Sequence, residues 1–292
     1  MPRVASNGVE LEYDRFGDAA NPALLLVMGL GAQMIAWDER FCRALAERGF
    51  HVIRFDNRDS GLSTHLDHLG APDLGAVLTR RSPPPYTLED MAADAFGLLD
   101  ALELRAAHLV GASMGGYTAQ LMAISHPERV LTLTSIMSGL GGEDDVRAAP
   151  DVAAAVLAPP PSGRDEMIER AVALSRLLGS PAYFDEERVR VFHARVLDRS
   201  HTFAGASRQL AAVLAAPSRR ARLGALRVPT LVIHGEADRL VPVENGRRTA
   251  AAVPGARLLI VPGMGHDLPP PLWPLLVDAI AQHAGASRAP AG

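Results

Sequence analysis

Three residues that lie far apart in the chain, Ser113, Asp238 and His266, have the types and surroundings needed for nucleophilic catalysis. A serine hydroxyl is a poor nucleophile near neutral pH, so it needs a base to take its proton and an acid to orient that base. His266 would be the base and Asp238 the acid. The sequence therefore predicts acyl transfer, with the acyl group carried for a time by Ser113.

The nucleophile is indicated by a glycine-rich turn, Gly111-Ala112-Ser113-Met114-Gly115-Gly116. An apolar segment, 107–110, precedes this turn and a helical pattern, 117–125, follows it. A G-x-S-x-G turn between a strand and a helix presents the serine oxygen above the sheet, because the small residues permit a very tight backbone. The alternatives are a strand-to-helix turn with no chemistry and one that binds a phosphate group.

Asp238 and His266 each follow the carboxyl end of an expected buried strand. Loops at that edge of a parallel sheet converge over one crevice, so residues distant in sequence can meet there. Glu236 competes with Asp238 for the role of acid, but Asp238 heads the segment Arg239-Leu240-Val241-Pro242 and is preferred.

The negative charge that forms on an attacked carbonyl oxygen needs preorganised donors, which we expect to be backbone amides. One is the amide of Met114, directly after the nucleophile. The other is expected in Met28-Gly29-Leu30-Gly31, with Leu30 as the donor. Met34, just beyond this loop, is the candidate for substrate contact.

The expected elements alternate between strands and helices. Asn7-Gly8 favours a type I′ turn and hence an opening antiparallel hairpin. Buried strands are expected at 23–28, 51–55, 107–110, 130–136, 230–234 and 257–261, and helices at 38–48, 87–102, 244–252 and 272–283. This order predicts a mostly parallel sheet covered by helices on both faces.

Between about 139 and 223 the strand signals vanish, and a proline-rich loop and arginine-laced helical segments follow. We interpret 139–223 as an inserted helical cap, and 1–138 with 224–292 as one core domain. The alternative is a set of ordinary surface helices.

Across essentially its full length the chain resembles the α/β-hydrolase superfamily, through the motifs above and the segment 56–63. The order Ser113, Asp238, His266 is the one these proteins use. The segments 26–29, 55–63, 111–116 and 262–266 resemble the branch of aclacinomycin methylesterases and related bacterial carboxylesterases. The sequence departs from the commonest pattern at Met28-Gly29, where relatives have His-Gly.

This resemblance implies the α/β-hydrolase fold and the cleavage of small or medium, largely uncharged carboxylic esters, methyl esters included. Perhydrolases or haloperoxidases that need no cofactor and carbon–carbon bond hydrolases remain enzymatic alternatives. A ligand-binding receptor on the same fold is the alternative outside catalysis. The segment after 55 usually builds the loop beside the active site, so Arg58 and Asp59 are expected to be structural rather than to bind substrate.

The charge and the residue composition exclude several classes of partner and cofactor. The net charge is −4 with no long run of one sign, so neither nucleic acid nor a membrane surface is expected as a partner. The chain contains no lysine, which excludes Schiff-base chemistry through a lysine amine. It has a single cysteine, Cys42, and no clustered Cys/His spacing, so neither a metal nor another cofactor is expected. The first residues lack secretory-signal features, and a cytoplasmic protein is the expectation.

Overall fold

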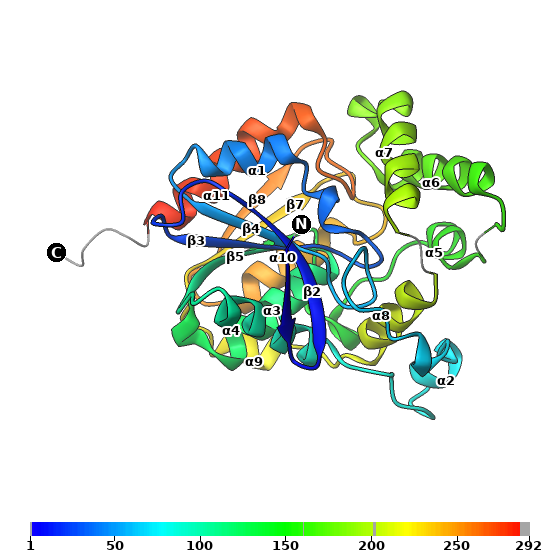
Figure 1. The fold of residues 1–292 in the computed structure, drawn as a ribbon, viewed down its shortest axis with the longest axis horizontal. Helices are drawn as coiled ribbons and strands as arrows, with labels where there is room; N and C mark the ends of the chain where they lie inside the picture. Colours follow the sequence, from blue (N-terminus) through cyan, green and yellow to red (C-terminus); the bar gives the residue numbers. More distant parts are fainter. Residues whose placement is uncertain (1, 160, 201–202, 287–292) are drawn as a thin grey trace.

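A single twisted sheet forms the centre of the molecule in a computed structural model that describes residues 2–159, 161–200 and 203–286 (Figure 1). The strands are β1 Arg3–Ser6, β2 Val9–Phe16, β3 Ala23–Val27, β4 His51–Phe55, β5 Ala107–Ala112, β6 Val130–Ile136, β7 Thr230–Gly235 and β8 Arg257–Val261. They lie in the order β1-β2-β4-β3-β5-β6-β7-β8. The hairpin strands pair antiparallel and β3 to β8 pair parallel, as predicted.

The hairpin turn has the backbone that its sequence predicts. Asn7 and Gly8 have φ of 47° and 80°, and both values lie in the left-handed region that a type I′ turn requires. Asparagine and glycine tolerate this region better than other residues, so the turn sets the register between β1 and β2.

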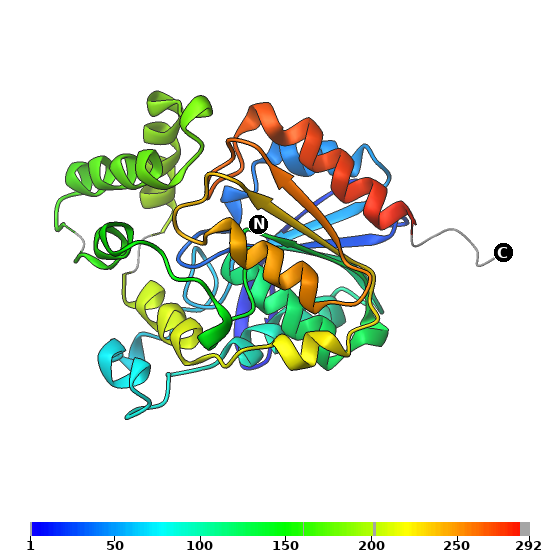
Figure 2. The same cartoon turned by 180° about the vertical axis from the view of Figure 1, so that it is seen from behind.

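Helices cover both faces of the sheet (Figure 2). α1 Glu39–Ala46 and α11 Trp273–Ala286 lie on one face; α3 Leu88–Ala101, α4 Met114–Ser125 and α10 Val243–Ala252 lie on the other. β3, β4, β5 and β7 are buried at every position, since a parallel sheet between two helix layers has no solvent face. Trp37 and Phe41 stack between the sheet and α11, and each such buried side chain contributes about 1.5–3 kcal/mol.

Helical segments fill the chain between β6 and β7: α5 Pro150–Leu157, α6 Arg164–Leu178, α7 Glu186–Arg199, α8 Phe203–Ala215 and α9 Arg220–Gly224. α6 and α7 pack on each other as a hairpin, and α9 packs on α4 and α10 of the core. In Figure 1, α5 to α8 gather beyond one end of the sheet. We propose 139–223 as the cap that the sequence predicts, although its last helix rests on the core.

A short helix that the sequence did not reveal, α2 Leu74–Leu78, packs on α8 of the cap. Beside it, a buried ion pair ties the cap to the core: Arg208 of α8 and Asp59, both without exposed surface, are joined by two hydrogen bonds of 2.6 and 2.8 Å. The Tyr86 hydroxyl also donates to Asp59, at 2.8 Å. Breaking such a pair leaves an uncompensated buried charge, which costs about 3–5 kcal/mol.

Cys42 of α1 has no exposed surface, and burial raises the pKa of its thiol to about 12, an effect that the Arg54 guanidinium only partly offsets. Only the thiolate reacts with thiol reagents, and at pH 8 it would be about 10⁻⁴ of the folded population. We therefore expect native protein to resist a disulfide reagent that labels the urea-unfolded chain once. Rapid stoichiometric labelling of native protein would contradict this burial.

The raised pKa of Cys42 also determines how the free energy of unfolding changes with pH. The folded pKa of Cys42 lies above its ordinary value of 9.0, so the unfolded chain releases its proton first as the pH rises. The free energy of unfolding should therefore decrease above about pH 9, and this part of the decrease should disappear in Cys42→Ala.

Candidate active site

Ser113 lies in a strained turn between β5 and α4, with φ 55° and ψ −122°. A β carbon at Gly111 would lie 2.1 Å from the Gly115 carbonyl oxygen, and one at Gly115 would lie 2.1 Å from that of Val27. Neither position can therefore carry a side chain without moving backbone. This crowding supports the unusual backbone of Ser113 and presents its hydroxyl at the carboxyl edge of the sheet.

His266 follows β8, and its ring lies between the other two residues of the predicted triad. Its Nε2 is 3.0 Å from Ser113 Oγ, and its Nδ1 is 2.7 Å from Asp238 Oδ2. With the proton on Nδ1, the ring donates to Asp238 and accepts from the serine hydroxyl. The structure thus brings together three residues separated by up to 153 positions.

Asp238 is 6% exposed and accepts several hydrogen bonds. The backbone amides of Leu240 and Val241 donate to its Oδ1 at 2.9 and 2.8 Å. Burial alone would raise the pKa of this carboxyl, but the charge of the His266 ring and the hydrogen bonds outweigh it and lower the pKa to about 2. The competing carboxylate, Glu236, is exposed and has no contact of this kind with His266.

The two backbone amides predicted for the oxyanion are those of Leu30 and Met114. Within the described part of the chain, neither amide has a hydrogen-bond acceptor. A β carbon at Gly29 would lie 3.0 Å from that of Ser113, so the Leu30 loop closely approaches the nucleophile. Asn57 Nδ2 donates to the Met28 carbonyl at 2.9 Å and holds this loop.

The remaining candidates differ in what surrounds them. Met34 has no exposed surface, and its amide donates to Asp56 at 2.7 Å. Substrate contact by Met34 stays a prediction, and Met34 does not line the cavity between α6 and α7. Arg58 forms a buried two-bond ion pair with Asp94 at 2.6 Å, and Asp59 pairs with Arg208, as the structural interpretation requires.

Two glutamines that the sequence did not single out connect the cap with the loop that carries Leu30. Gln209 of α8 accepts a hydrogen bond from the Gly31 amide at 2.7 Å. Gln33 Nε2 donates to the carbonyls of Val196 and Ser200 at 2.9 and 2.7 Å. Their partners lie more than 160 positions away, so no local pattern could have identified them.

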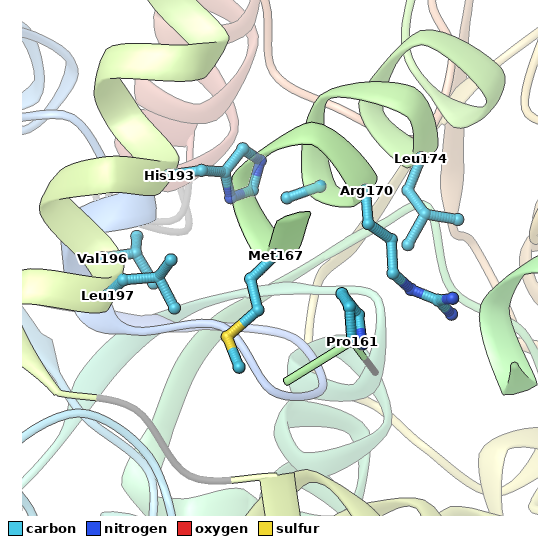
Figure 3. Close-up of a pocket in the computed structure, with 8 residues that line it drawn as sticks. Pro161, Met167, Arg170, Leu174, His193, Val196 and Leu197 are labelled. Atoms are coloured by element: carbon cyan, nitrogen blue, oxygen red, sulfur yellow. The ribbon is translucent and has the colours of Figure 1, made fainter. Parts of the chain in front are cut away.

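An apolar cavity of about 160 Å³ lies between α6 and α7. Figure 3 shows Met167, Arg170 and Leu174 on one side and His193, Val196 and Leu197 on the other; Pro161 and Ala171 complete the lining. The guanidinium of Arg170 is engaged within the cap, because it donates to the carbonyls of Ala155, Ala158 and Pro159. Burial lowers the pKa of His193, which favours a neutral ring in this wall.

The described residues contain no cluster of three or more His, Cys, Asp or Glu side chains that could hold a metal ion. Nor does any helix in the described part of the chain have the length and apolar character to cross a membrane.

Comparison with known proteins assigns the family. Residues 22–189 match the family model described as alpha/beta hydrolase fold, which covers more than half of the chain. The chain belongs to the α/β hydrolase family. Residues 206–270 of this α/β hydrolase also match a model described as TAP-like protein. The predicted fold class is confirmed.

Two relatives of the chain are named as hydrolases of different bonds. The α/β hydrolase is 32% identical to rhodomycin D methylesterase DauP of Streptomyces sp. (strain C5), over 97% of this chain and 98% of that protein. It is 30% identical to a 2-hydroxy-6-oxononadienedioate/2-hydroxy-6-oxononatrienedioate hydrolase of Burkholderia vietnamiensis, over 90% of this chain and 87% of that protein. The predicted resemblance to methylesterases is confirmed.

A solved structure shows the same fold. The meta-cleavage product hydrolase CumD of Pseudomonas fluorescens IP01 superposes with a TM-score of 0.78 at 20% identity, over 99% of this chain and 98% of that one. At this identity the likeness shows the fold alone.

Proposed function

We propose that this α/β hydrolase is a serine ester hydrolase in which Ser113, His266 and Asp238 form the catalytic triad. The observation that carries the proposal is the line of contacts from Ser113 Oγ through the His266 ring to Asp238. The two amides of Leu30 and Met114, which have no acceptor among the described residues, support it. The similarity to a methylesterase over nearly the whole chain points to the same class of reaction.

The geometry supports a two-stage reaction. Ser113 Oγ attacks the ester carbonyl while His266 Nε2 takes its proton, and the amides of Leu30 and Met114 bind the oxyanion. The alcohol leaves with the proton from His266, and water, activated by the same ring, then releases the acid. Asp238 stabilises the imidazolium, and its pKa of about 2 keeps it ionised throughout the neutral range.

We propose that the cap cavity receives the acyl group of the substrate. Its walls are largely aliphatic, and its one guanidinium is bound to backbone carbonyls. Such a cavity favours uncharged apolar groups, because a buried carboxylate would need a free cationic partner. We therefore propose uncharged esters of small or medium size, methyl esters included, as substrates.

A carbon–carbon bond hydrolase is the second candidate, favoured by the similarity to the Burkholderia enzyme. The dienedioate in that enzyme's name carries two carboxylates, which the cap cavity does not match. Purified protein should be offered p-nitrophenyl and methyl esters of increasing acyl length, and separately a carboxylated vinylogous diketone. We expect ester hydrolysis; cleavage of the diketone without ester hydrolysis would contradict the proposal.

The role of the cavity has its own test. Leu197→Arg places a charge in the cavity wall, and we expect it to lower kcat/KM for a long-chain p-nitrophenyl ester by about 10- to 100-fold, the value of one well-buried apolar group. The acetate should be much less affected. Leu157→Arg, at a leucine of α5 that is 57% exposed, is the matched control. Equal effects of Leu197→Arg on both esters would place the acyl group elsewhere.

A further inference from the structure

The loop that carries His266 is held by the cap. We call residues 262–267 the histidine loop and residues 178–181, directly at the end of α6, the cap turn. The His266 amide donates to the Leu178 carbonyl at 2.7 Å. The Ser180 hydroxyl accepts from the Gly265 amide at 2.9 Å and donates to Asp267 Oδ1 at 2.6 Å. Three consecutive residues of the histidine loop are therefore bound to the cap turn.

The two segments also fit too closely for side chains. A β carbon at Gly265 would lie 2.4 Å from the carbonyl carbon and oxygen of Gly179. One at Gly179 would lie 2.6 Å from the Ser175 carbonyl oxygen and 3.1 Å from Asp267 Oδ2. Real β carbons are essentially never nearer than 3.0 Å to such atoms, so the contact between the two segments depends on glycine at position 265, whereas glycine at position 179 is required by the end of α6 itself.

Ser180 is the centre of this contact. It is 1% exposed, and its amide also donates to Asp267 Oδ1 at 3.0 Å. Without the hydroxyl, the buried Gly265 amide loses its acceptor and Asp267 loses a donor. Asp267 keeps the Ser180 amide, but the buried Gly265 amide cannot be left unpaired without cost, so the histidine loop would be expected to shift.

A shift of this loop would act on the reaction. Asp238 fixes one side of the His266 ring, but the backbone that carries the ring lies between β8 and the 3-10 helix Pro270–Leu272, outside regular structure. A displacement of about 1 Å in a reacting group can cost about 100-fold in rate. The Ala237 amide holds this backbone at the Met264 carbonyl, at 2.9 Å, and the cap turn holds it at the next three residues, 265–267.

We propose that Ser180 is a positioning residue, which holds His266 Nε2 against Ser113 Oγ through the backbone of Gly265 and the side chain of Asp267. The inference rests on the proposed function. It also makes the cap part of the catalytic geometry, since a movement of α6 would carry the histidine loop with it.

A fluorophosphonate probe measures this positioning without knowledge of the natural substrate. Ser113 Oγ would form a bond to phosphorus as the phosphorus–fluorine bond breaks, with fluoride leaving and the hydroxyl proton going to His266. The labelling rate therefore reports whether His266 reaches Ser113. The same preparations should be assayed for kcat and KM with p-nitrophenyl acetate.

We expect Ser180→Ala to lower both the labelling rate and kcat by about 10- to 100-fold, with KM changed less than about threefold. Ser180→Thr keeps the hydroxyl and should recover most of the rate. Ser6→Ala is the matched control, because Ser6 is equally a buried serine, whose hydroxyl donates to the Asp94 carbonyl at 2.7 Å. Its labelling rate should stay within twofold of wild type.

A wild-type labelling rate in Ser180→Ala would overturn the positioning role and leave the proposed function intact. Equal losses in Ser180→Ala and Ser6→Ala would also overturn it, because the effect would then be one of stability. A wild-type protein that is neither labelled nor active would overturn the proposed function and the inference together. If Ser180→Ala fails to fold, Asp267→Ala, which removes the other end of the same contact, should show the same loss.

Discussion

Ser113→Ala should abolish ester hydrolysis, with kcat reduced by about 10⁶-fold, the size of loss found when the nucleophile of such a triad is removed. Alanine keeps the backbone of the turn but leaves no oxygen 3.0 Å from His266 Nε2. The acyl-enzyme route is then closed, and only the binding groups and oxyanion donors remain. The measurement is kcat for p-nitrophenyl acetate, with circular dichroism to show that the variant folds.

Ser138→Ala is the matched control for this experiment. Ser138 follows the neighbouring strand β6 and is 1% exposed, and its hydroxyl has no hydrogen-bond partner among the described residues. Its replacement should change kcat less than about threefold. Residual activity above about 1% in Ser113→Ala would show that another group is the nucleophile.

Asp238→Asn should lower kcat by about 10⁴-fold with little change in fold. An asparagine amide at this position can donate to His266 Nδ1, which favours the tautomer with its proton on Nε2. That nitrogen could then no longer accept the Ser113 proton. KM should change far less than kcat, because Asp238 acts through the ring and has no predicted contact with substrate.

Glu236→Gln separates the two acidic residues of this loop. Glu236 is exposed, whereas Asp238 is buried against His266, so Glu236→Gln should leave kcat within about twofold of wild type. The pKa of about 2 for Asp238 also predicts that wild-type activity is not lost through protonation of this carboxyl above about pH 4. A larger loss in Glu236→Gln than in Asp238→Asn would reverse the assignment.

Much of the core could be predicted because its signals are local. The strands 51–55, 130–136 and 257–261 begin and end where the apolar runs do, and Asn7-Gly8 sets the opening hairpin. The candidate triad was likewise visible in short motifs, since its members lie one, three and five residues after the ends of β5, β7 and β8. Local sequence patterns are enough to predict a feature when that feature depends on a few neighbouring residues, as a turn type or the end of a strand does.

The contacts between the cap and the core could not be predicted in the same way. α2 is only one turn or so long and has no distinct periodicity, and its packing on α8 depends on residues more than 120 positions away. The pairs Arg208 with Asp59 and Gln209 with Gly31 join segments that no local pattern relates. Ser180 looks like any loop serine until the structure places it against Gly265.

The most direct test of the account is a partitioning experiment on the acyl-enzyme. Esters of one acid with different leaving groups, p-nitrophenyl and phenyl among them, are hydrolysed in the presence of a fixed concentration of methanol. If acyl-Ser113 is a shared intermediate, the ratio of methyl ester to free acid should be the same for every leaving group. A ratio that changes with the leaving group, or no turnover of any of these esters, would contradict the account.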